Sequence, residues 1–128
     1  MNALDALRVH ALAGIPLGLV TGLLLGLVAR HRDGWGGYAS ERRRAARLAH
    51  VCLVMLPVLS GLYAVWLTGS ARPDLLAWGA WLWIPGSVAL AAALAGVAAR
   101  PTWRAALPLP AVAVTAGAVL FAFAGLST

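Results

Sequence analysis

Three histidines are the side chains of this sequence best suited to chemistry in a membrane: His10, His31 and His50. A neutral imidazole can ligate haem iron, hold a metal ion or transfer a proton. His10 and His50 belong to separate apolar runs and fall near opposite faces of the predicted membrane, too far apart to share one haem. His31 and His50 flank the same loop and could together bind haem b. For His50 we favour a hydrogen-bonded interfacial histidine over a haem ligand, a metal ligand or a proton carrier, and no metal site and no obligatory cofactor are predicted.

The sequence contains few other residues or motifs that carry out catalysis. The single cysteine, Cys52, excludes an intrachain disulfide and a cysteine-based zinc site. No Ser/His/Asp set, HExxH, Walker loop or GxGxxG element is present, so we expect no enzymatic activity. Hydroxyl groups within the spans could line a passive pore, although we expect most of them to bond carbonyls of their own helix; they belong to Thr21, Ser60, Tyr63, Ser87 and Thr115.

The elements that must position these residues are long apolar helices. The chain has 128 residues, of which 62% are hydrophobic and 11% charged, with a mean hydropathy of +0.85. Soluble domains are about 45–50% apolar and about 25% charged. Four segments reach the roughly 20 residues that span a bilayer, at about 9–29, 48–69, 75–99 and 105–126. We predict an all-α, polytopic membrane protein whose four transmembrane helices form one compact bundle over residues 1–128.

The predicted spans contain no Asp, Glu, Lys or Arg. Ion-coupled transporters and pumps keep such residues in the membrane, so the sequence argues against both classes. Every span does carry proline, which removes a helix hydrogen bond and kinks the helix: Pro16, Pro57, Pro85, Pro108 and Pro110. These kinks could shape the bundle or open a ligand site in a broken helix. In the third span, Pro85 and Gly86 could separate an interfacial segment from a short inner helix.

The arginines predict the orientation. All ten basic residues are Arg, against four acidic residues, for a formal net charge of +6. Two arginines, Arg8 and Arg72, lie on one side of the predicted bundle. Eight lie in the first and third connections, on the other side: Arg30, Arg32, Arg42, Arg43, Arg44, Arg47, Arg100 and Arg104. The positive-inside rule places these eight in the cytoplasm and both termini on the non-cytoplasmic side.

The tryptophans agree with this arrangement, because Trp anchors helices at the two membrane interfaces. We expect Trp66, Trp78 and Trp81 near the outer ends of their spans and Trp103 near the inner loops. Trp83 lies deeper in its span and is expected to face a neighbouring helix.

Glycine recurs every four residues along the first span, at Gly14, Gly18, Gly22 and Gly26, with His10 one step earlier. Small residues at this spacing let another helix approach closely. The partner could be a helix of the same chain or another subunit, so these five residues are a helix-packing or partner face.

The loop before the second span is strongly basic. Ser40 is a candidate N-cap and Glu41 would sit at the positive end of a helix, which would extend the second span inward as a basic segment. That segment carries four arginines, Arg42, Arg43, Arg44 and Arg47. They could meet anionic lipid headgroups or an acidic partner surface. Nucleic acid is not expected, because the arginines lie between apolar runs.

We therefore expect a non-catalytic accessory, structural or assembly subunit of a larger membrane complex, with an energy-transducing respiratory or photosynthetic complex as the favoured host. The all-Arg, Ala- and Gly-rich composition indicates a GC-rich bacterial genome and hence the bacterial inner membrane. One alternative is a haem- or quinone-binding electron-transfer subunit that uses His50. Another is a small oligomeric passive channel or carrier.

Overall fold

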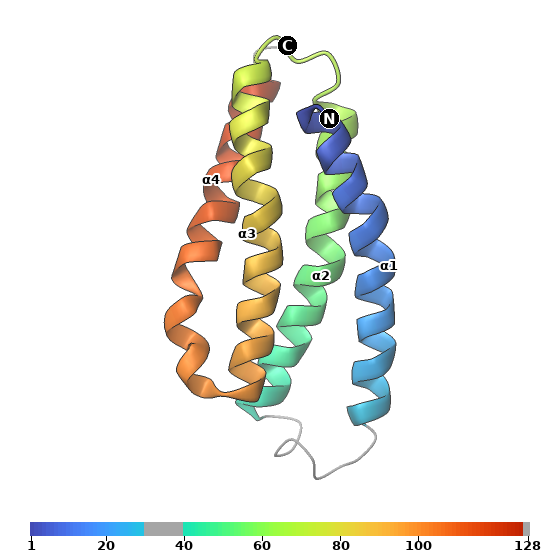
Figure 1. The fold of residues 1–128 in the computed structure, drawn as a ribbon, viewed down its shortest axis with the longest axis vertical. Helices are drawn as coiled ribbons and strands as arrows, with labels where there is room; N and C mark the ends of the chain where they lie inside the picture. Colours follow the sequence, from blue (N-terminus) through green and yellow to red (C-terminus); the bar gives the residue numbers. More distant parts are fainter. Residues whose placement is uncertain (30–39, 127–128) are drawn as a thin grey trace.

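The protein is all-α. A computed structural model describes residues 1–29 and 40–126, which form four long apolar helices packed as a bundle (Figure 1). The elements in chain order are α1 (Ala3–Ala29), α2 (Glu41–Trp66), α3 (Pro73–Ala99), the 3₁₀-helix η1 (Pro101–Ala106) and α4 (Pro108–Gly125). The predicted all-α bundle of four helices is confirmed.

Each of the four is a candidate membrane span by length and composition, and the protein is therefore described as a multi-pass membrane protein. The spans are 25 to 27 residues long, with η1 included in the fourth, and have mean hydropathies of 1.8 to 2.0. Large apolar side chains cover the outside of the bundle, which suits contact with lipid. Among the most exposed are Leu12 and Leu23 on α1 and Leu109 and Val112 on α4.

Local sequence signals set where the helices begin. The side chain of Asn2 accepts the backbone N–H of Asp5 at 2.8 Å, as an N-cap does, so α1 starts before the predicted boundary at residue 9. Ser40 caps α2 by accepting the backbone N–H of Arg43 at 3.3 Å. The predicted inward extension of the second span is thus present, and α2 begins at Glu41 rather than near residue 48.

One expectation about proline is wrong, and one alternative is excluded. Pro108 and Pro110 do not kink the fourth span, because Pro108 begins α4 and both occupy its first turn. In the first turn of a helix the backbone N–H groups have no partner within the helix, so proline removes no hydrogen bond there. The third span is not broken at Pro85 and Gly86. The helix α3 runs continuously from Pro73 to Ala99, so no separate interfacial segment exists there.

The helices pack mainly in chain order: α1 along α2, α2 along α3 and α3 along α4, with α1 also meeting α3. The helix α3 lies between its neighbours and holds the most buried residues, whereas α1 lies at one side (Figure 1). We call the end of the bundle where α1 starts and α4 ends the terminal end. We call the opposite end, where α2 begins and η1 lies, the arginine end.

Each end has its own buried cluster. At the terminal end, the cluster contains five large side chains and three alanines, contributed by all four helices and by the C-cap of α2: Leu7, Ala64, Leu67, Leu76, Ala80, Trp83, Phe121 and Ala124. At the arginine end, it consists of three alanines and one valine from α2 and α3: Ala45, Ala46, Val97 and Ala98. The core is therefore large-residue packing at one end and small-residue packing at the other.

Candidate functional site

The main polar cluster among the described spans centres on His10 of α1. Its Nδ1 lies 2.8 Å from Oγ of Ser60 on α2, and its Nε2 lies 3.2 Å from Oγ of Ser87 on α3. The two serines are 0% and 3% exposed. One imidazole ring thus connects three helices, and we call His10, Ser60, Trp83 and Ser87 the His10 node.

The Ser60 hydroxyl has three neighbours. It accepts the indole N–H of Trp83 at 2.8 Å, and its single hydrogen can go to the carbonyl of Leu56 at 3.0 Å or to His10 Nδ1 at 2.8 Å. Either His10 or Ser60 can therefore supply the hydrogen in the bond between them.

Ser87 is placed in the same way at the other ring nitrogen. Its hydroxyl lies 2.7 Å from the carbonyl of Ile84 and 3.2 Å from His10 Nε2. Both ring nitrogens of His10 therefore have a serine partner, whichever of them carries the proton of the neutral ring.

Close approach of α1 to α2 makes this geometry possible. A Cβ on Gly14 would lie 2.3 Å from Cγ of Pro57, and one on Gly18 would lie 2.7 Å from the carbonyl oxygen of Leu53. At Gly22, a Cβ would meet the ring of His50 at 2.4 Å, while at Gly26 it would meet nothing within 4 Å. Three glycines of the predicted face therefore pack against α2 of the same chain.

Aromatic rings hold the other side of the node. The Tyr63 ring lies edge-on to Trp83 at a centroid distance of 5.3 Å and contacts Phe121 at 4.7 Å. Phe121 also lies over Gly79, where a Cβ would be 2.6 Å from its ring. Trp83 is 2% exposed, so its predicted position against neighbouring helices is confirmed. These contacts fix the indole N–H that points to Ser60.

A small cavity of about 220 Å³ adjoins the node between α1, α2 and α3. Its lining includes His10, Gly14, Cys52 and Pro57, and it is almost wholly apolar. Its volume would hold a small apolar molecule. Besides His10 and Ser87, the polar side chain in its lining is Cys52.

His50 lies at a second position along the α1–α2 contact. Its ring packs against Gly22, and its Nδ1 is buried with no hydrogen-bond partner among the described residues. An apolar cavity of about 270 Å³ adjoins it, between α1, α2 and α3. His31, its predicted partner for haem b, lies outside the described residues. Within residues 1–29 and 40–126, no three His, Cys, Asp or Glu side chains form a group that could hold a metal ion.

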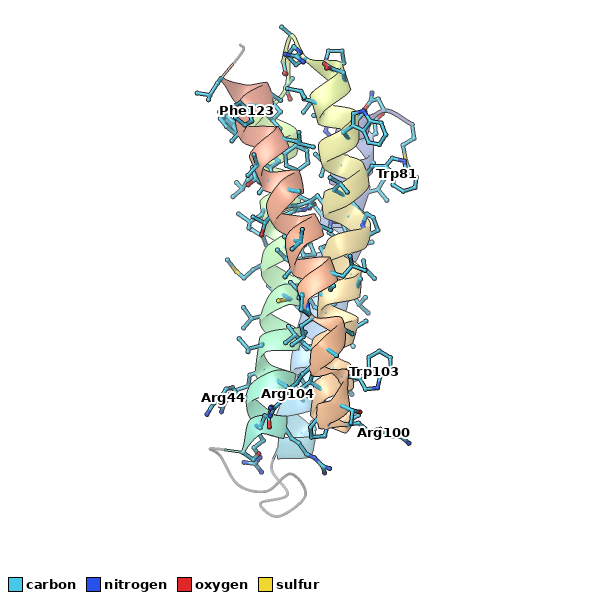
Figure 2. The ribbon with its side chains drawn as sticks, turned by 90° about the vertical axis from the view of Figure 1, so that its left-hand side faces the viewer. Arg44, Trp81, Arg100, Trp103, Arg104 and Phe123 are labelled. Carbon is cyan, nitrogen blue, oxygen red and sulfur yellow. The ribbon has the colours of Figure 1, made fainter. Side chains whose placement is uncertain are left out.

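The predicted arginines and tryptophans gather at the bundle ends. Figure 2 shows Arg44, Arg100 and Arg104 at the arginine end, with Trp103 beside them and Trp81 at the opposite end. Arg42, Arg43 and Arg47 lie with Arg44 in the first turns of α2. Four tryptophans are half or more exposed, as membrane anchors are: Trp66, Trp78, Trp81 and Trp103.

The hydroxyl groups behave as predicted, since most of them bond carbonyls of their own helix. Thr21 donates to Gly18 and Thr115 donates to Ala111. Ser60 and Ser87 do the same but also reach His10, and this second role was not predicted. The available signal was the presence of one histidine and two serines in three different apolar spans.

The chain matches no protein-family model, no curated protein and no solved structure.

Proposed function

We propose that the protein is a non-catalytic accessory, structural or assembly subunit of a larger membrane complex. The observation that carries this proposal is the His10 node. Both ring nitrogens of His10 bond side chains of the same chain, and the node ties α1, α2 and α3 together. A buried polar group that satisfies its own helices serves structure, and a rigid set of helices suits a subunit that packs against others.

The outer faces of the bundle support the same proposal. Because Gly14, Gly18 and Gly22 already contact α2, a partner subunit would meet other surfaces of the chain. The helices α1 and α4 lie away from each other and expose bulky side chains, including Leu12 at 76% and Leu109 at 81%. Such faces would pack against helices of the host complex.

The proposed host is an energy-transducing respiratory or photosynthetic electron-transfer complex in the bacterial inner membrane. We place the arginine end in the cytoplasm and both termini outside. The support is that Arg44, Arg100 and Arg104 share one end of the bundle (Figure 2), which agrees with the positive-inside rule.

The experiment is purification in mild detergent through a C-terminal tag, with identification of proteins present in stoichiometric amounts. We expect a defined large complex. Leu12→Trp and Leu23→Trp on α1, compared with Val112→Trp and Val119→Trp on α4, would show which face meets the complex. Recovery of the protein alone, as a monomer or homo-oligomer, would reject the accessory function.

A second candidate, a cofactor-binding electron-transfer subunit, is favoured by one observation at His50. Its Nδ1 lacks a partner among the described residues, and a cavity of about 270 Å³ lies beside the ring. Haem bound through His50 would give a Soret absorption band that His50→Ala removes and His10→Ala retains. A colourless protein purified from haem-replete cells would exclude haem, and a solvent extract without quinone would exclude the rest of this candidate.

A further inference from the structure

A larger hollow lies at the arginine end, between α2, α3 and η1. It measures about 500 Å³. Its rim carries Glu41 and Arg44 from α2 and Arg104 from η1, while its interior is formed by apolar side chains that include Leu48, Leu94 and Leu107. Charge at the rim and hydrocarbon inside, at the end of a set of candidate membrane spans, match the two parts of a phospholipid molecule.

We propose that this hollow, the α2–η1 groove, binds one anionic phospholipid. Its phosphate lies between Arg44 and Arg104, and an acyl chain lies against the leucines. This site is independent of the proposed function, because it uses none of the residues of the His10 node or of the outer faces of α1.

The two arginines suit a phosphate. Arg44 and Arg104 come from separate elements, yet both lie on the same side of the arginine end, whereas Arg100 and Trp103 lie on the other side (Figure 2). Guanidinium groups bind phosphate oxygens through paired N–H donors. Their aliphatic stems can lie along the apolar wall while the charged groups stay at the headgroup level.

Glu41 sets the position and the charge of the site. Its carboxylate forms an ion pair with Arg104, and the side chains are 45% and 59% exposed. An exposed pair of this kind is weak, and one carboxylate leaves other guanidinium N–H groups available. With Arg44, Arg104 and Glu41 together, the rim carries one net positive charge. That charge matches the single negative charge of a phosphodiester such as phosphatidylglycerol.

The apolar interior favours a lipid over a soluble phosphate or an acidic peptide. Leu48 is 47% exposed along the groove, and Val97 beneath it is 4% exposed. Trp103 is half exposed at the same end, which is the position of an interfacial anchor. The hollow therefore lies at the depth where headgroup and acyl chain meet.

The test is lipid binding to the detergent-purified protein, measured by native mass spectrometry. Dioleoyl phosphatidylglycerol, dioleoyl phosphatidylcholine and inorganic phosphate are the probes. We expect one phosphatidylglycerol bound in preference to phosphatidylcholine. Each arginine near an anionic lipid contributes about fivefold in affinity, so Arg44→Gln with Arg104→Gln should lower phosphatidylglycerol affinity about 25-fold. Arg44→Lys with Arg104→Lys keeps the charge and should lose less.

Two controls separate this site from general attraction and from misfolding. Arg42→Gln removes a charge from the same turn of α2 without touching the groove, and should keep the preference for phosphatidylglycerol. Leu48→Trp fills the groove with both arginines intact, and should lower the affinity for phosphatidylglycerol. Equal loss in Arg42→Gln, an unchanged double glutamine variant, or competition by inorganic phosphate at equal concentration would each overturn the proposal.

Discussion

At the terminal end of the bundle, the rings of Tyr63, Trp83 and Phe121 interlock at centroid distances of 4.7 to 6.0 Å beside a hydrogen-bonded histidine. At the arginine end, the same helices meet through alanines such as Ala45 and Ala98. Hollows occur at both ends. One of about 430 Å³ lies at the terminal end beside Met1, Trp81 and Ile84, and two of about 270 and 500 Å³ lie toward the arginine end.

The difference teaches how one short chain can combine a fixed frame with adaptable surfaces. Between membrane helices, lipid supplies no hydrophobic drive, so packing contacts and hydrogen bonds must hold the bundle together. Large interlocking rings and the His10 node permit one arrangement of the helices. Alanine contacts specify the arrangement less. We therefore expect stability to reside mainly at the terminal end, and lipid binding at the arginine end, where Arg44 and Arg104 supply the charge.

The largest expected effect compares the two cores directly. Phe121→Ala should lower the free energy of unfolding by about 3 kcal/mol, because a fully buried ring leaves a cavity that its neighbours cannot fill. Val97→Ala at the arginine end should cost about 1 kcal/mol, since it removes two methyl groups. Unfolding in mixed micelles titrated with sodium dodecyl sulfate measures both. Equal losses would remove the distinction between the ends.

The two histidines offer a second comparison. His10→Ala breaks the bonds to Ser60 and Ser87 and should cost about 2 kcal/mol in the same assay. His50→Ala loses ring contacts with Gly22 and should cost about 1 kcal/mol or less. Equal losses in the two variants would show that the bonds of His10 to Ser60 and Ser87 contribute nothing beyond ring packing.

Two glycines of α1 test how closely this helix packs against α2 at two positions along its length. Gly18→Ala places a methyl group against the backbone carbonyl of Leu53, which cannot move aside. We expect a loss of about 1.5 kcal/mol. Gly26→Ala meets open space and should leave stability unchanged or raise it slightly, because alanine favours the helix. If both substitutions were neutral, α1 would not pack on α2 through its glycines.

The smallest effect is expected from the exposed ion pairs. Asp74→Asn removes the partner of Arg72, which lies 2.8 Å away near the terminal end, and Glu41→Gln removes the partner of Arg104 at the arginine end. Exposed pairs contribute little to stability, so neither variant should shift the unfolding midpoint measurably. A clear shift in one of them would show that surface charge contributes to the contrast between the ends.

Much of the fold could be predicted because membrane crossing imposes a strong length and hydropathy requirement. The predicted third span lies within two residues of α3, and Ser40 with Glu41 predicts the start of α2. The first and fourth helices start elsewhere than predicted, and α2 starts before the apolar run of its span. A hydropathy profile detects only the apolar part of a helix. The residues that determine where α1, α2 and α4 begin are Asn2, Ser40 and Pro108.

The candidate site could be predicted only in part. His10, Ser60 and Ser87 were each noted as polar residues in apolar spans, but the pairs that bond are 50 and 77 residues apart. Whether they meet depends on the rotation of each helix about its own axis. Nearly uniform apolar spans do not define that rotation, because no polar face marks which side of a helix points inward. The glycine spacing correctly indicated close approach of another helix, yet it did not identify α2 as that helix.

The order of packing along the chain has a consequence for biosynthesis. Because each helix packs chiefly against the one before it, a newly made helix finds its partner already in the membrane. The His10 node closes only when the third helix has been made, since Trp83 and Ser87 both belong to α3. A nascent chain that stops after Trp66 holds His10 next to Ser60 alone. The arrival of α3 therefore completes the node, and α4 then covers Tyr63 and Trp83 with Phe121.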